Sequence, residues 1–128
     1  MFYFQLILLI ICGGLIGYER QKTHKVIGIR SVILLMLGAF LFTHISSQIG
    51  GDPSRIAAQV VTGTGFLSAG IIWKEKATNI SNLTTAIIVW ITSSLGCIIA
   101  FKLFQEAIVS TILILAILKA NFIKDNIK

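Results

Sequence analysis

The stretch Phe2–Tyr18, FYFQLILLIICGGLIGY, carries no charged residue. A helix needs roughly 17–25 apolar residues to cross a bilayer core about 30 Å thick, so this run is long enough to span it. The first basic residues, Arg20 and Lys22, follow the run, whereas in a secretory signal peptide they precede it. The stretch therefore predicts a transmembrane helix that is retained, and similar runs recur along the chain.

The composition of the whole chain indicates that lipid surrounds most of its side chains. Hydrophobic residues make up 55% of the 128 residues and charged residues 12%, and the mean hydropathy is +0.90. Ordinary soluble proteins carry roughly 25% charged residues. We expect an all-α integral membrane protein, a single domain over residues 1–128 that forms a compact bundle of five short transmembrane helices. The expected spans are residues 2–18, 29–47, 56–73, 83–101 and 103–118.

The distribution of basic residues favours five spans over four, the main alternative, in which the last segment lies on the membrane surface. With five spans, only Arg55 and Lys102 fall on one side. The nine on the other side are Arg20, Lys22, Lys25, Arg30, Lys74, Lys76, Lys119, Lys124 and Lys128. Cytoplasmic loops carry the excess of Lys and Arg, so we expect the N-terminus outside and the C-terminus in the cytoplasm. The basic residues are expected to contact anionic lipid headgroups, and nucleic-acid binding is not expected.

Small residues mark two segments for close helix packing. Gly13 and Gly17 form a GxxxG pair, which lets another helix approach closely, either within the chain or in a homo-oligomer. The segment from Thr62 to Gly70 is also rich in Gly, Ser and Thr. Its simpler interpretation is tight packing of the bundle, and the alternative is a ligand site at a loosened helix.

Acidic residues are few, and none is placed for an ion pathway. They are Glu19, Asp52, Glu75, Glu106 and Asp125, all outside the middle of the expected spans. Magnesium is usually held by carboxylates that leave it several waters, so an autonomous magnesium channel is disfavoured. The sequence has no metal-ligand spacing, phosphate loop or nucleophile–base pattern. We expect no cofactor, no metal site and no enzymatic activity.

Several ordered motifs resemble the MgtC/SapB family of bacterial inner-membrane proteins. They are GGLIGYERQ at residues 13–21, GIR at 28–30, DPSRIAAQVVTGTGFLSAG at 52–70, and LTTA at 83–86 followed by Trp90. The resemblance implies a multi-pass protein of the bacterial inner membrane, associated with growth in low magnesium, survival inside host cells and virulence. It also implies binding to the F-type ATP synthase and restraint of that enzyme. We expect similarity to the short members, which lack a soluble C-terminal domain of the ACT type.

These observations predict that the chain is a membrane interaction protein, which modulates a partner complex through helix–helix contacts. The residues expected at the partner face are Glu19, Arg20, Asp52, Arg55, Gln59, Gly63, Gly65, Gly70, Glu75, Thr84 and Thr85. Glu75 and Thr84 are included because the resemblance implies that their stretches matter for family function. The first alternative is a transporter, or transporter subunit, for magnesium or another small solute. A purely structural membrane scaffold is the second.

Overall fold

Five helices make up the described part of the chain. The structure is a computed structural model that describes the backbone of residues 1–74 and 80–125 and the side chains of residues 1–72 and 83–120. The helices are α1 (Phe2–Lys22), α2 (Ile29–Ile49), α3 (Pro53–Lys74), α4 (Ile80–Ala100) and α5 (Phe104–Asp125). The expected all-α architecture with five helices is therefore confirmed.

Each helix is longer than the span expected for it. Helix α1 continues to Lys22, four residues past the expected end, and α3 begins at Pro53, three residues before the expected start. Within the described residues, α1, α2, α3 and α4 are long and apolar enough to cross a membrane. Membrane crossing by α5 stays a prediction, as does the direction in which the bundle is inserted.

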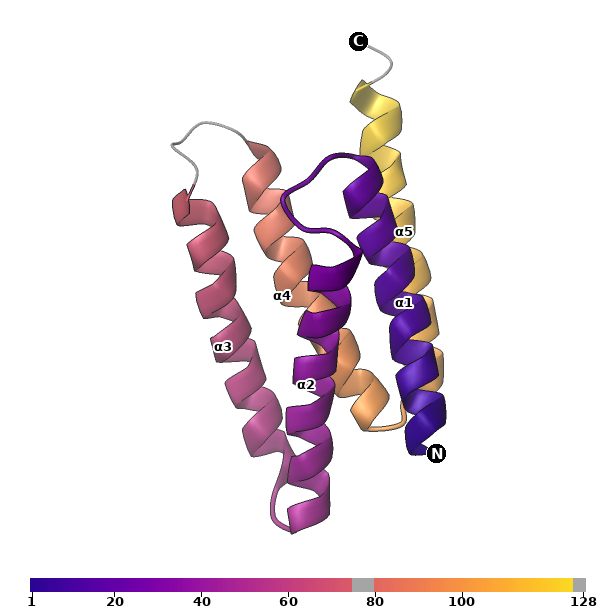
Figure 1. The fold of residues 1–128 in the computed structure, drawn as a ribbon, viewed down its shortest axis with the longest axis vertical. Coiled ribbons are helices and arrows are strands. Elements are labelled where there is room, and N and C mark those ends of the chain that lie inside the picture. Colours follow the sequence, from indigo (N-terminus) through magenta and orange to yellow (C-terminus); the bar gives the residue numbers. More distant parts are fainter. Residues whose placement is uncertain (75–79, 126–128) are drawn as a thin grey trace.

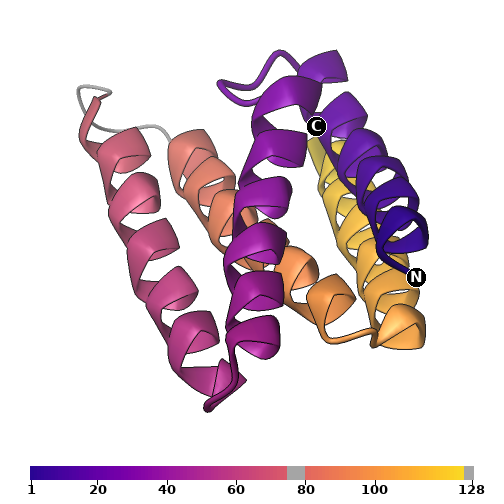
Figure 2. The same cartoon turned by 60° about the horizontal axis from the view of Figure 1, so that its bottom comes forward.

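The helices alternate in direction along the bundle (Figures 1 and 2). Helices α2 and α4 lie in the centre, with α3 on one side and α1 and α5 side by side on the other. One end of the bundle holds the α1–α2 turn, the last residues of α3 and α5, and the first residues of α4. The opposite end holds the N-terminus and the α2–α3 and α4–α5 turns. We call the first of these the basic end, because Arg20, Lys22, Lys25 and Arg30 gather there.

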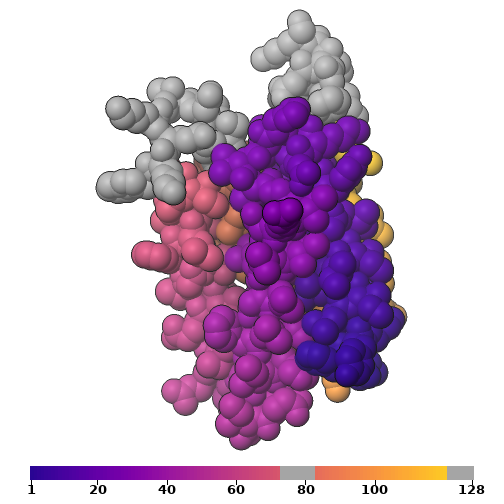
Figure 3. All heavy atoms as spheres, viewed as in Figure 1, coloured from indigo at the N-terminus to yellow at the C-terminus, as the bar shows by residue number. Residues whose placement is uncertain are grey.

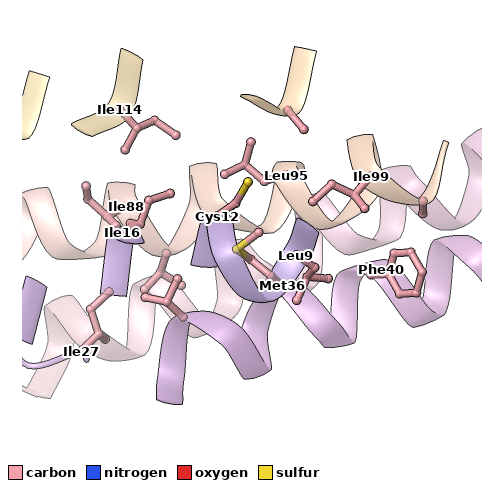
Figure 4. Close-up of a cluster of buried hydrophobic side chains, with 14 of the residues drawn as sticks. Leu9, Cys12, Ile16, Ile27, Met36, Phe40, Ile88, Leu95, Ile99 and Ile114 are labelled. Atoms are coloured by element: carbon pink, nitrogen blue, oxygen red, sulfur yellow. The ribbon is translucent and has the colours of Figure 1, made fainter. Parts of the chain in front are cut away.

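The apolar core lies between α1, α2, α4 and α5. Figure 4 shows Leu9, Cys12 and Ile16 of α1 pointing among residues of α2 and α4, including Met36 and Leu95. Helix α3 contributes no side chain to the fully buried apolar cluster within its described residues, and only Ile71 packs against that cluster, partly buried. Among the described residues, α3 therefore contributes less to the apolar core than any other helix.

Glycines bring α2 into direct contact with the backbones of α1 and α4. A Cβ atom built on Gly17 would lie 2.5 Å from the Cα atom of Ile29, and one on Gly13 would lie 3.0 Å from the Sδ atom of Met36. Both glycines of the GxxxG pair therefore pack against α2 within the chain. The carbonyl oxygen of Met36 occupies the equivalent space at Gly96 of α4, a contact that the sequence analysis did not anticipate.

The Gly17 contact yields a stability prediction with a matched control in the same helix. Gly17→Ala forces a methyl group into the backbone of α2, and overpacking of this kind typically costs about 1–3 kcal/mol. A Cβ atom at Gly14 meets nothing within 4 Å, so Gly14→Ala should be neutral or stabilising by up to about 1 kcal/mol through helix propensity. Equilibrium unfolding in mixed detergent micelles measures both. Equal destabilisation by the two variants would contradict the close α1–α2 contact.

Candidate functional site

An ion pair lies buried at the basic end of the bundle. Arg20 is only 4% exposed, and its Nε atom donates a hydrogen bond of 2.8 Å to Oε2 of Glu19. Arg20 extends the buried row of α1 formed by Leu9, Cys12 and Ile16. Its Nη1 atom is buried and, within the described part of the chain, has no hydrogen-bond partner. Leaving a charged donor unpaired in a low-dielectric interior is costly, so this nitrogen is an unusual feature of the fold.

The α1–α2 turn holds the backbone of the Glu19–Arg20 pair. The Thr23 hydroxyl donates to the carbonyl oxygens of Glu19 and Arg20, both at 3.1 Å. The Lys25 amide also donates to the Arg20 carbonyl, at 3.1 Å, after the chain has reversed through His24 at a φ of 54°. These bonds satisfy carbonyl groups that a helix C-terminus otherwise leaves free. The turn therefore fixes the position from which the Arg20 side chain enters the bundle.

Thr84 and Thr85 of α4 lie at the same height as Arg20. Helices α1 and α4 are antiparallel, and Nε2 of Gln5 donates to the carbonyl oxygens of Ile99 at 2.7 Å and Ala100 at 3.3 Å. Arg20 is fifteen residues beyond Gln5, or about 22 Å along the helix axis. The same rise on α4, counted back from that contact, reaches Thr84 and Thr85. Thr85 is fully buried and Thr84 half-buried, so four of the expected site residues gather at the basic end.

Asp52 and Arg55 lie at the opposite end, where α3 begins. Oδ1 of Asp52 accepts hydrogen bonds from the Ser54 hydroxyl at 2.6 Å and from the Ser54 amide at 2.9 Å, immediately before Pro53 opens the helix. These bonds hold the pKa of the Asp52 carboxyl below its ordinary value. Asp52 therefore caps α3, which is a structural role for one of the expected site residues.

One face of α3 is open along its length. Arg55, Gln59, Gly63, Phe66 and Gly70 lie within an arc of about 80° around the helix axis, and all five are exposed. Phe66 is 80% exposed, and a Cβ atom built on Gly63 or on Gly70 would meet nothing within 4 Å. We call these five residues the open face. On this face the exposed Phe66 ring lies between Gly63 and Gly70, which have no side chains.

The opposite face of α3 is attached to α4 through the hydroxyl group of Ser68. Thr64 and Ser68, one turn apart, are buried, and the Ser68 hydroxyl donates a 3.0 Å hydrogen bond to the carbonyl oxygen of Ala86. Gly65 lies away from the open face and is half-buried. The small residues of this segment therefore lie on two faces of α3. Gly63 and Gly70 are on the exposed face, and Thr64 and Ser68 are on the buried one.

The expected site residues thus occupy three places in the structure. Glu19, Arg20, Thr84 and Thr85 are at the basic end, Asp52 and Arg55 are at the other end, and Gln59 begins the run of α3 residues between them. Glu75 lies outside the described residues. Sequence reasoning missed Gln5, whose amide ties α1 to α4, although its isolation in an apolar run was a usable signal.

Comparison with known proteins identifies the family. The model of the MgtC family matches residues 6–124 of the chain. The chain belongs to the MgtC family. It is 44% identical over 107 residues to Protein MgtC of Brucella abortus (strain 2308), a match that covers 82% of this chain and 44% of that protein. The multi-pass location in the bacterial inner membrane follows from this membership together with the four membrane-spanning helices.

Two other relatives give matches of similar extent. "Putative magnesium transporter YhiD" of Escherichia coli (strain K12) is 39% identical over 128 residues, covering 92% of this chain and 59% of that protein. Protein MgtC of Salmonella typhimurium (strain 14028s) is 40% identical over 104 residues, covering 80% of this chain and 45% of that protein. The chain therefore spans about half the length of these relatives. No solved structure matches the chain.

The Glu19–Arg20 pair yields a stability prediction for this MgtC-family chain. Glu19→Leu leaves the Arg20 charge buried without its partner, which should lower the free energy of unfolding by roughly 3–5 kcal/mol. The double variant Glu19→Leu/Arg20→Met removes both charges and should lose less than the single variant. Lys22→Gln, at an exposed position of the same turn of α1, should change stability by about 0.5 kcal/mol or less. Unfolding in mixed micelles measures all three, and a Glu19→Leu loss no larger than that of Lys22→Gln would refute the buried pair.

Proposed function

We propose that the chain is a non-enzymatic regulatory protein of the inner membrane that acts in magnesium limitation by binding another membrane protein. The proposed binding surface is the open face of α3. The names of the relatives connect the family with magnesium, and the resemblance described above adds intracellular survival and virulence. The F-type ATP synthase, restrained by this contact, is the partner that the resemblance suggests.

The exposure of the open face is the observation that supports this proposal most. Between helices in lipid, attraction comes from close packing and interhelical hydrogen bonds, because lipid is as apolar as the side chains. Gly63 and Gly70 leave room for the backbone of a second helix, and Phe66 between them can enter a recess on that helix. The Gln59 side chain carries both a donor and an acceptor and is exposed on the same face. The open face therefore offers a partner helix both the space and the polar group that such contacts use.

The interior of the bundle gives less support to the transporter alternative. A solute pathway needs polar groups around a cavity near the middle of the membrane. Gln59 and Thr62, two of the three side chains that could supply it, are exposed, and the third, Thr64, is buried against the rest of the bundle. The buried hydroxyls of Thr92 and Thr111 bond to their own helices, at the carbonyl oxygens of Ile88 and Ala107.

Site-directed photocrosslinking in the native membrane tests the proposed surface. A benzoylphenylalanine residue at Phe66 should capture a subunit of the F-type ATP synthase in cells grown at low magnesium. The same residue at Ile112 is the matched control, because Ile112 is 62% exposed but lies on α5. Gly63→Leu should abolish capture from position 66 without unfolding the protein, because the added side chain fills the open face and begins in empty space. Equal capture from position 112, or unchanged capture in Gly63→Leu, would contradict the proposal.

Magnesium flux into proteoliposomes separates the two functions. The purified chain should give no uptake above that of empty vesicles, since Gln59 and Thr62 are exposed and Thr64 is buried against the rest of the bundle. Gln59→Leu is the control that removes the one amide of α3. Uptake by the folded wild-type protein that disappears in Gln59→Leu would overturn the interaction function and support the transporter.

A further inference from the structure

A groove of about 390 Å³ opens between α2 and α3 near the basic end. Figure 3 shows it as a hollow between the two helices, with α4 visible at its base. Its lining includes Ser31, Leu34 and Leu35 of α2, Leu67 and Ile71 of α3, and Val89 of α4. Leu34 and Leu67 are 66% and 52% exposed and form the rim, whereas Val89 is 5% exposed and forms the floor. The groove is therefore apolar, open to the surrounding lipid and of a size typical of ligand pockets, roughly 300–1,000 Å³.

Positive charge stands at the mouth of this groove. Arg30 lies one helical turn before Leu34 on the same face of α2, and both are exposed. Ser31, the next residue, is exposed and lines the groove, and Lys25 precedes the groove residue Ile27 by two positions. The described carboxylates lie elsewhere: Glu19 is paired with Arg20, while Asp52 and Glu106 are at the opposite end. An anionic group at the mouth thus meets positive charge without a competing described acid.

The shape of the groove selects a single chain as its occupant. An α-helix about 10 Å across fills on the order of 400 Å³ with each turn, so the groove could seat only about one turn of a partner helix. One acyl chain, by contrast, can lie along the groove from its mouth to its floor. Basic pockets between transmembrane helices are also a recurring way to bind anionic headgroups.

We propose that the groove is a binding site for one anionic phospholipid. The acyl chain lies against Leu35, Leu67 and Val89, and the phosphate is held by the Arg30 guanidinium and the Ser31 hydroxyl. This site is separate from the open face of α3, because Leu67 and Ile71 lie about 80° and 120° around the helix from the centre of that face. The lipid can therefore remain in place whether or not a partner helix is bound.

Lipid titration followed by native mass spectrometry tests the headgroup contact. The full chain in detergent should retain phosphatidylglycerol in preference to phosphatidylcholine, at one molecule per chain. Arg30→Gln should weaken phosphatidylglycerol binding roughly fivefold, the loss expected for one basic residue at an anionic headgroup. Lys22→Gln is the matched control, an exposed cation at the same end of the bundle but on α1. An equal loss in Lys22→Gln would overturn the proposal, because it would show a general effect of charge.

Photocrosslinking from the lipid tail tests the acyl-chain contact. Phosphatidylglycerol with a photoreactive group in its acyl chain should label peptides of α2 and α3 around Leu35 and Leu67. Leu67→Trp, which fills the groove from its rim, should remove this label, and Leu34→Trp does the same from the other rim if the first variant does not fold. Ile112→Trp on α5 should leave it unchanged. Persistent labelling in a folded Leu67→Trp or Leu34→Trp protein, or labelling spread evenly over all helices, would overturn the proposal.

Discussion

Direct contact between helix backbones at α2 is the constraint on which the rest of the structure depends. Gly17 of α1 admits the Cα atom of Ile29, and Gly96 of α4 admits the carbonyl oxygen of Met36. Because no side chain separates these backbones, α2 is held between α1 and α4 at fixed heights. The alignment of the apolar row of α1 with α4 follows from this, and so does the depth at which Arg20 enters the bundle. Helix α3 then lies against the remaining sides of α2 and α4.

Much of the fold could be predicted from the sequence because lipid imposes a simple rule on each segment. In lipid, every backbone polar group must be satisfied within the segment, so an uncharged apolar run of sufficient length is a helix. This rule locates all five helices, although α3 begins at Pro53, three residues before the expected start. The GxxxG pair in α1 was also recognised as a packing surface. Its neighbour, α2, could not be named, because spacing along one helix says nothing about which other helix approaches it.

The candidate site was harder to predict for the same reason. The small residues of α3 look alike in the sequence, yet Ser68 bonds to α4 while Gly63 and Gly70 face outward. Only the rotation of α3 about its axis separates the two groups, and that rotation is set by tertiary contacts. The Glu19–Arg20 pair was recognised as a candidate, but its burial depends on α1 continuing as a helix four residues beyond the apolar run. Gln5 and Gly96 act through distant partners and leave only weak local signals.

The polar groups of the bundle show two different uses of hydrogen bonding in lipid. The hydroxyls of Thr92 and Thr111 donate hydrogen bonds to carbonyl oxygens one turn earlier in their own helices. These bonds therefore add little attraction between helices. Gln5 and Ser68 instead reach carbonyl oxygens on another helix. Such bonds are worth about 0.6 kcal/mol on average in membranes, so they specify which helices meet more than they stabilise the whole.

The attachment of α3 to α4 through Ser68 also bears on how the chain assembles during synthesis. The chain emerges from its N-terminus, so α3 enters the membrane before α4. Until α4 follows, the Ser68 hydroxyl has no Ala86 carbonyl to bond, and α3 has only its smaller contact with α2. Helices α1 and α2, by contrast, can join at Gly17 as soon as both are inserted. These contacts favour assembly in pairs, in which an α3–α4 hairpin docks onto an α1–α2 hairpin.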